Sequence, residues 1–139
     1  MQRFTWLIVL IAGLAFAFSI EGWKVTPFSA LLAVCVILLA WWMSPFSGGR
    51  TKRHADVMAL PPEQRRVVAY WRPGCIYCQR LRGGLGSDAK KVTWINIWQD
   101  PDAAAFVRSV NNGDETVPTV VIGGEVLVNP DPREVSAAL

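Results

Sequence analysis

Two long runs of apolar residues fill much of the first third of the chain and constrain most strongly how it can fold. Residues 4–20 hold seventeen positions without a charge, and residues 28–43 hold sixteen more. Each run is near the lower limit for a membrane-spanning helix, and a few flanking residues extend it to the roughly 20 positions that cross the hydrocarbon core. The runs therefore predict a transmembrane helical hairpin over residues 1–43, with the lipid bilayer as a partner.

The segment between the runs favours this reading. Residues 21–27 carry Glu21, Lys24, an interfacial Trp and Pro27, and Pro is well suited to the first turn of a helix. An alternative is that residues 1–20 are a cleaved signal peptide, because Ala15-Phe16-Ala17 resembles a cleavage site. The second helix would then be the only anchor.

Basic residues predict the orientation of the hairpin. Arg3 precedes the first run, and Arg50, Lys52 and Arg53 follow the second. Cytoplasmic flanks of membrane helices collect Lys and Arg. The sequence thus predicts a multi-pass protein of the cell membrane whose C-terminal domain faces the cytoplasm.

The net charge of +3 does not indicate a nucleic-acid partner, because residues 55–139 contain nine Lys or Arg and ten Asp or Glu. The basic excess lies in residues 44–62, which we predict to be a flexible linker that begins at Ser44-Pro45 and Gly48-Gly49. His54, the only histidine, lies in this linker and is expected to be solvated.

Residues 63–139 alternate between strand and helix patterns. Strands are predicted at residues 67–71, 92–98, 119–122 and 125–128, and helices are predicted to begin near Cys75, Asp100 and Asp131. Gly83, Gly84 and Gly86 are expected to end the first of these helices early, and Gly123-Gly124 predicts a tight hairpin. With right-handed crossovers, the first two strands pair in parallel and the hairpin joins them antiparallel. The result is an α/β domain with a four-stranded mixed sheet.

Two cysteines three positions apart follow the first predicted strand. Cys75 and Cys78 stand at the start of a helix, where unpaired N–H groups and the positive end of the dipole favour a thiolate at the first sulfur. Cys78, one turn later, is expected to point inward and to resolve a mixed disulfide. Half of a zinc site is the alternative, but the only other ligands of suitable type are Cys35 and His54, so no metal site is expected.

A second motif stands about forty residues further on. Thr116-Val117-Pro118 precedes the third predicted strand, and a cis bond before Pro118 would turn the chain sharply next to the two thiols. The backbone of Val117 would then be available to an extended thiol ligand. Alone, a proline at a strand start is an equally good explanation.

Residues 67–139 resemble the glutaredoxins, in the thioredoxin superfamily, through Cys75-Ile76-Tyr77-Cys78, Thr116-Val117-Pro118 and the Gly123-Gly124 hairpin. They are most similar to the mycoredoxins, in which a stretch like residues 104–107 leads into a loop like Asn111-Asn112-Gly113, and a stretch like residues 116–120 is followed by a pair like Asn129-Pro130. The resemblance implies a three-layer thioredoxin-like fold and reduction of mixed disulfides between proteins and a small thiol. Cys75 would be the nucleophile and Cys78 the resolving thiol, while Tyr77, Thr116, Val117 and Pro118 would bind the small thiol. No tightly bound cofactor is implied.

Two departures from the family pattern bear on the small thiol. Ile76 stands where glutaredoxins usually have Pro and mycoredoxins usually have Gly. Glutathione-using members carry a Gly-Gly pair and acidic residues after the fourth strand, where this chain has Val128-Asn129-Pro130-Asp131. Mycothiol therefore suits the sequence better than glutathione as co-substrate. Alternative functions are a dithiol reductase or oxidase of the thioredoxin type, and a non-enzymatic redox-sensing or iron–sulfur module.

Overall fold

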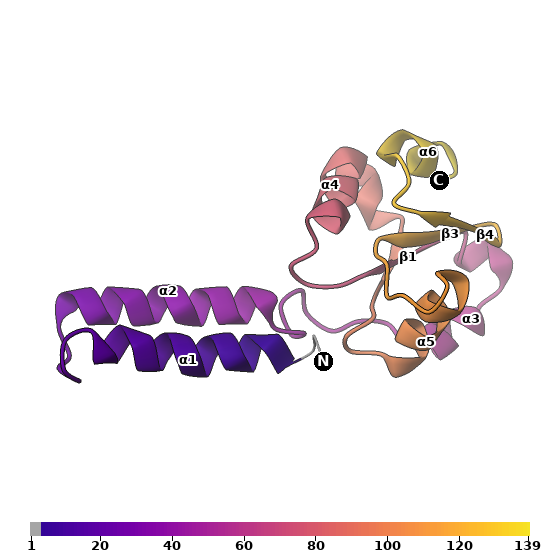
Figure 1. Ribbon diagram of the computed structural model, residues 1–139. Coiled ribbons are helices and arrows are strands. Elements are labelled where there is room, and N and C mark those ends of the chain that lie inside the picture. Colours follow the sequence, from indigo (N-terminus) through magenta and orange to yellow (C-terminus); the bar gives the residue numbers. More distant parts are fainter. Residues whose placement is uncertain (1–3) are drawn as a thin grey trace. The chain divides into compact units, whose positions relative to one another are not determined.

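The computed structural model describes residues 4–139, which form two units with a boundary between Gly48 and Gly49. The first unit contains two helices, α1 (Thr5–Ser19) and α2 (Pro27–Met43), which run side by side in Figure 1. A capping box starts α2, because Ser29 N–H donates to Thr26 Oγ1 at 3.1 Å and Thr26 N–H donates to Ser29 Oγ at 2.9 Å. The helices predicted from the two apolar runs are therefore present.

Small residues allow α1 and α2 to approach each other. A Cβ added at Gly13 would lie 2.7 Å from Val36 Cγ1, a separation that real side chains do not show. The side chains that become buried are also small, namely Ala17, Ser29, Ala33 and Ala40. The large apolar residues of both helices remain mostly on the outside.

The prediction that these helices cross a membrane is wrong. In residues 4–139 no helix is both long and apolar enough to do so. The 15 residues of α1 and the 17 residues of α2 reach roughly 23 and 26 Å, short of the roughly 30 Å of a hydrocarbon core. The same finding corrects three further predictions, namely the bilayer as a partner, the localisation in the cell membrane and the orientation toward the cytoplasm. Arg3, on which the orientation partly rested, lies outside the described residues.

The second unit is built on a four-stranded sheet in the order β2-β1-β3-β4. The strands are β1 (Val67–Trp71), β2 (Thr93–Asn96), β3 (Thr119–Ile122) and β4 (Glu125–Val128). β1 pairs with β2 in parallel and with β3 antiparallel, and β3 pairs with β4 antiparallel. The mixed sheet predicted from the sequence is thus confirmed. β2 is shorter than predicted, because Asn96 Oδ1 accepts a hydrogen bond from Trp98 N–H at 2.9 Å and turns the chain.

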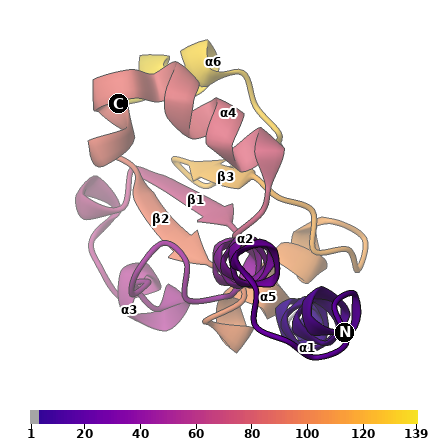
Figure 2. The same ribbon diagram turned by 90° about the vertical axis from the view of Figure 1, so that its left-hand side faces the viewer.

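Helices cover both faces of the sheet, as Figures 1 and 2 show. α4 (Ile76–Leu85) and α6 (Pro132–Ala137) lie on one face, where Leu81, Leu85 and Val135 pack against Val67 and Ala69. α3 (His54–Met58) and α5 (Pro101–Val110) lie on the other, where Val57, Ala104 and Val107 pack against Val68 and Tyr70. Short 3-10 helices occupy Pro62–Gln64 and Gly86–Lys90. The three-layer thioredoxin-like fold is confirmed.

α4 does not end at its first glycines, contrary to the prediction. It continues through Gly83 and Gly84 and stops only at Gly86, whose φ is +53°. A Cβ at Gly84 would lie 2.5 Å from Pro132 Cγ. Gly84 is therefore a close-packing position that lets α6 lie on α4, and the cost of glycine in the helix is offset by this contact.

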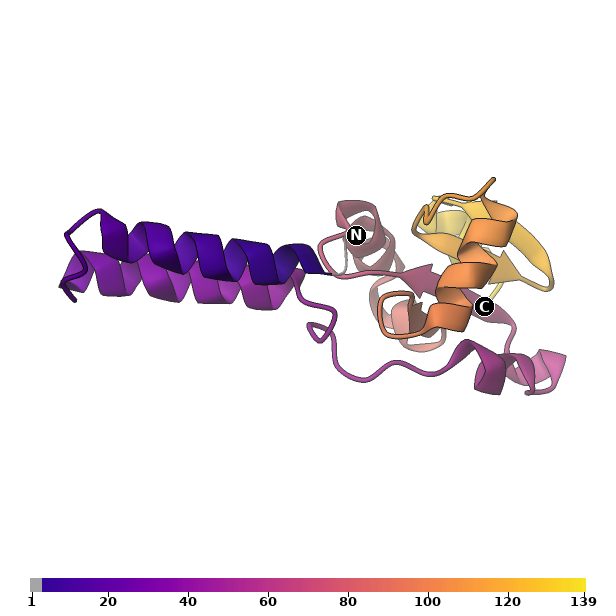
Figure 3. The same ribbon diagram turned by 60° about the horizontal axis from the view of Figure 1, so that its bottom comes forward.

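The segment before the sheet was not predicted to contain a helix, yet α3 packs against α5 (Figure 3). His54 N–H donates to Asp100 Oδ2 at 2.5 Å, and His54 Nδ1 lies 2.8 Å from the Tyr70 hydroxyl. The imidazole stacks on Phe106 with ring centroids 5.0 Å apart. The expectation that His54 is solvated is wrong, because its partners come from residues far along the chain.

Candidate active site

The two cysteines lie where β1 passes into α4. Pro73 and Gly74 form the turn, and Gly74 has φ +73°, a conformation that favours glycine. Cys75 follows as the N-cap of α4, with extended backbone angles. The end of a central strand therefore delivers the first cysteine to the beginning of a helix, as the sequence predicted.

The environments of the two sulfurs differ. Cys75 and Cys78 form a disulfide, with Cα atoms 5.3 Å apart, a usual separation for this bond. Cys78 N–H donates to Cys75 Sγ at 3.1 Å, so the first sulfur occupies the place of an N-cap acceptor. Cys75 is partly exposed, whereas Cys78 is buried. In the reduced protein this arrangement stabilises negative charge on Cys75 more than on Cys78.

The Thr116-Val117-Pro118 segment lies opposite Cys75. The Val117–Pro118 peptide bond is cis, and the carbonyl oxygen of Val117 lies 3.5 Å from Cys75 Sγ. Val117 and Pro118 are buried, while Thr116 is exposed. The two motifs that the sequence analysis singled out are thus brought together, although 42 positions separate Cys75 from Val117.

Tyr77 lines a pocket of about 200 Å³ at the beginning of α4. The other lining residues are Arg80 and Leu81 of α4, with Asn129, Pro130, Asp131 and Pro132 from the segment between β4 and α6. Asp131 also caps α6, because its carboxylate accepts a hydrogen bond from Arg133 N–H at 2.8 Å. The sequence analysis named Tyr77 as a binding residue and singled out residues 128–131 as bearing on the small thiol, but did not name Arg80 as a binding residue, since only the fold brings it beside that segment.

Three arginines surround the cysteines in the sequence but have different surroundings in the structure. The Arg82 guanidinium lies over the rings of Trp71 and Trp94, with centroid distances of 4.9 and 4.4 Å, and burial lowers the pKa of Arg82. Arg72 lies 5.9 Å from the Trp98 ring centroid. Arg80 alone lines the pocket. Arg72 and Arg82 therefore pack on aromatic rings by cation–π contact.

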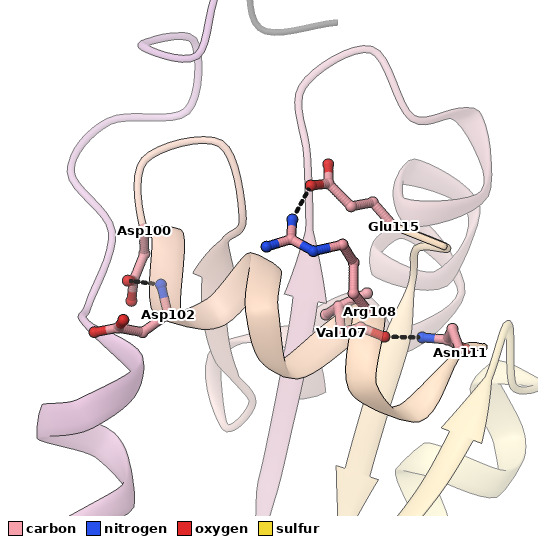
Figure 4. A network of polar contacts seen from close by, with 6 residues as sticks. All are labelled: Asp100, Asp102, Val107, Arg108, Asn111 and Glu115. Carbon is pink, nitrogen blue, oxygen red and sulfur yellow. Dashed lines mark hydrogen bonds and ion pairs between the residues drawn. The ribbon is translucent and has the colours of Figure 1, made fainter. Parts of the chain in front are cut away.

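The helix and loop before the Thr116-Val117-Pro118 segment carry a polar network, shown in Figure 4. Arg108 Nη1 donates to Glu115 Oε1 at 2.5 Å, and Asn111 Nδ2 donates to the carbonyl of Val107 at 2.8 Å. At the other end of α5, Asp102 N–H donates to the capping Asp100 at 3.1 Å. Residues 4–139 contain no group of three or more His, Cys, Asp or Glu placed to hold a metal ion.

The sequence of the second unit matches known proteins. The family model described as Glutaredoxin matches residues 67–127. A Mycobacterium tuberculosis protein with a provisional glutaredoxin name is 41% identical over 74 residues, which cover 52% of this chain and 88% of that protein. Mycoredoxin 1 of Corynebacterium glutamicum is 38% identical over 74 residues, which cover 52% of this chain and 91% of that protein.

Proposed function

Because the chain belongs to the glutaredoxin family and is a thiol-disulfide oxidoreductase, we propose that it reduces mixed disulfides between proteins and mycothiol, with Cys75 as the attacking sulfur. The observation that carries the proposal is the N-cap position of Cys75. Its Sγ accepts the Cys78 N–H at 3.1 Å and is partly exposed. A thiolate at this sulfur is stabilised and can reach a substrate disulfide.

The proposed cycle uses one protein thiol. The Cys75 thiolate attacks the mycothiol sulfur of a client–mycothiol disulfide, the old S–S bond breaks, and the client leaves as a thiolate that takes up a proton. Mycothiol is then bound to Cys75 by a new disulfide. A second mycothiol thiolate attacks the bound mycothiol sulfur, which releases Cys75 as a thiolate and forms mycothiol disulfide. In net terms, one mycothiol thiol is consumed for each client thiol released, and both mycothiol molecules leave as mycothiol disulfide.

The segment after β4 supports mycothiol over glutathione. In glutathione-using members of the family this place carries a Gly-Gly pair and acidic residues that hold the charges of glutathione. Here Asn129 N–H already donates to the Pro118 carbonyl at 2.8 Å, and Pro130 has no N–H to donate. A ligand carboxylate therefore finds neither of these two backbone donors. Mycothiol is a pseudo-disaccharide without the carboxylates of glutathione and does not need them.

The pocket beside Tyr77 is the proposed site for the sugar part of mycothiol. Arg80, Asn129 and Asp131 supply polar groups along its wall, and Tyr77 supplies a ring. Sugar hydroxyls suit such a lining, because they can both donate and accept hydrogen bonds. Thr116, Val117 and Pro118 are proposed to hold the part of the substrate next to the reacting sulfur, through the backbone that faces Cys75.

Two variants assayed together test the roles of the cysteines. Cys75→Ser should abolish turnover of a client–mycothiol disulfide, because it removes the nucleophile. Cys78→Ser should keep a substantial part of the turnover with mycothiol and accumulate a Cys75–mycothiol adduct, visible as added intact mass. Cys35→Ser is the control, since Cys35 is a free cysteine on α2.

Two results would contradict the proposal. Equal rates with mycothiol and glutathione at equal concentration would refute the choice of small thiol. If Cys78→Ser were as inactive as Cys75→Ser, the chain would use both cysteines, as in the dithiol route. One observation favours this dithiol function: Cys75 and Cys78 form a disulfide in the structure.

A further inference from the structure

The three carbonyl groups of residues 116–118 have different partners. The Thr116 carbonyl accepts a hydrogen bond from Thr119 Oγ1 at 2.8 Å, and the Pro118 carbonyl accepts one from Asn129 N–H at 2.8 Å. The middle carbonyl, that of Val117, lies 3.5 Å from Cys75 Sγ. Hydrogen bonds to its two neighbours therefore restrain the direction in which the Val117 carbonyl points.

The Thr119 hydroxyl is fully buried and is bonded on both sides. Its residue belongs to β3, where it pairs with Tyr70 and Val128, so its backbone is held by the sheet. Its oxygen accepts a hydrogen bond from Asn111 Nδ2 at 3.1 Å and donates its single hydrogen to Thr116. A hydroxyl that accepts from one neighbour must direct its hydrogen to another, so Asn111 orients this bond.

Asn111 links the same hydroxyl to the end of α5. The second hydrogen of its amide goes to the Val107 carbonyl at 2.8 Å, as Figure 4 shows. One side chain thus joins a helix end to the hydroxyl that braces residue 116. In the sequence Asn111 indicates only that a helix stops, which explains why it was not singled out as a site residue.

We propose that Asn111 and Thr119 are positioning residues, which hold the Val117 carbonyl against the sulfur of Cys75. This inference rests on the proposed function, in which Cys75 is the nucleophile. Neither residue touches the sulfur itself. Their effect passes through the Thr116 carbonyl to the peptide unit that faces the reaction.

The position of the Val117 carbonyl has a chemical consequence. In the reduced protein a thiol at Cys75 can donate its hydrogen to this oxygen, whereas a thiolate cannot and is repelled by it. The Cys78 N–H acts in the opposite sense, because it stabilises the thiolate. The reactivity of Cys75 thus depends on a balance between two contacts, and Asn111 and Thr119 maintain one of them.

Alkylation of the reduced full-length chain by iodoacetamide tests the proposal without any disulfide substrate. The measured quantity is the pH at which Cys75 reacts at half its maximal rate. Thr119→Val removes the hydroxyl and should lower this midpoint by roughly half a pH unit, which corresponds to one neutral hydrogen bond. Thr119→Ser keeps the hydroxyl and should restore the wild-type midpoint. Asn111→Ala should shift the midpoint in the same direction as Thr119→Val, but less.

Ser109→Ala is the matched control, because it removes a nearby hydroxyl that bonds only within α5, to the Phe106 carbonyl. A lower melting temperature of Thr119→Val with an unchanged midpoint would mean a merely structural role and would overturn the proposal. A second readout is the KM for a client–mycothiol disulfide, which should rise in Thr119→Val while kcat changes little. If the wild type turned over no such disulfide, the proposed function would fail, while the alkylation result would still decide this inference.

Discussion

The two units of the chain place their apolar residues in opposite ways. In the α1–α2 hairpin the buried side chains are small, whereas large ones such as Phe16 and Leu38 are 66% and 62% exposed. In the α/β domain large side chains form the core, and Tyr70 and Ile95 are fully buried. High apolar content alone therefore does not tell which side chains pack. The arrangement of polar residues between the apolar ones decides it.

The helices of the two units show this contrast directly. Apolar residues surround α1 and α2, so neither helix has a polar face that must stay outside. In α5 the buried residues include Ala104 and Val107, while Asp102 and Arg108 are exposed on the opposite side. An amphipathic helix can bury only one face. Its orientation on the sheet is consequently set by its own sequence.

The largest difference between the units is expected when one leucine in each unit is replaced by alanine. Leu85→Ala should lower the free energy of unfolding of the α/β domain by about 2–5 kcal/mol, because it leaves a cavity at a side chain that is only 5% exposed. Leu38→Ala should change the stability of the hairpin by less than about 0.5 kcal/mol. Urea denaturation combined with hydrogen exchange of the amides in β1 and α2 would separate the two units. Equal losses would mean that Leu38 is buried by a partner.

Glycines at close helix contacts sharpen the comparison further. Gly84→Ala should destabilise the domain by about 1–3 kcal/mol, since the new Cβ would overlap Pro132 of α6. Its neighbour Gly83 has no atom near the place of a Cβ, so Gly83→Ala should stabilise α4 by about 0.5–1 kcal/mol. Gly13→Ala should weaken the hairpin, where Val36 stands in the way.

The melting temperatures of these three variants show which glycine substitutions stabilise the protein and which destabilise it. If Gly83→Ala and Gly84→Ala had the same effect, the contact between α4 and α6 would not be the reason for glycine at position 84. If Gly13→Ala changed nothing, α1 and α2 would be free to separate.

The sequence predicted the elements whose signals are local. The strand at residues 67–71, the hairpin turn at Gly123-Gly124 and the start of α5 after Asp100 each follow from a few neighbouring residues. α3 could not be predicted in this way, because it is held by contacts with residues that are far away in the sequence. His54 binds Asp100, 46 positions further on, and Val57 belongs to the core.

In the candidate site, too, some features follow from neighbouring residues and others only from the fold. The roles expected for Cys75 and Cys78 follow from their spacing in the sequence. The bond between Thr119 and Asn111 depends on how a loop returns to the sheet, and the pocket wall at Asn129 depends on how the segment between β4 and α6 lies against α4. The error at the N-terminus has another cause. Apolar content predicts a membrane-spanning helix only where the helix is also long enough, and α1 and α2 have 15 and 17 residues.

The smallest expected effect concerns pH. Burial, with a further contribution from Asp100, raises the pKa of the Tyr70 phenol above its ordinary value of 10.0. The folded domain therefore keeps a proton that the unfolded chain loses above about pH 10. Its stability is complete below that pH and falls as the pH rises, because the unfolded state then binds fewer protons than the folded state. By pH 11 the loss should be about 1 kcal/mol, and the described part of the hairpin contains no tyrosine.

Tyr70→Phe isolates this contribution. The phenol oxygen and His54 Nδ1 share a hydrogen bond of 2.8 Å, so the variant should lose about 1 kcal/mol at neutral pH, the usual worth of one hydrogen bond. Because the variant lacks the phenol, its stability should decline less than that of the wild type between pH 9 and 11. Tyr77→Phe, which removes the exposed phenol beside the pocket, controls for the general effect of alkaline pH. Urea unfolding at several pH values measures both slopes. If Tyr70→Phe and the wild type lost stability in parallel above pH 10, the buried phenol would not be the source of the alkaline sensitivity.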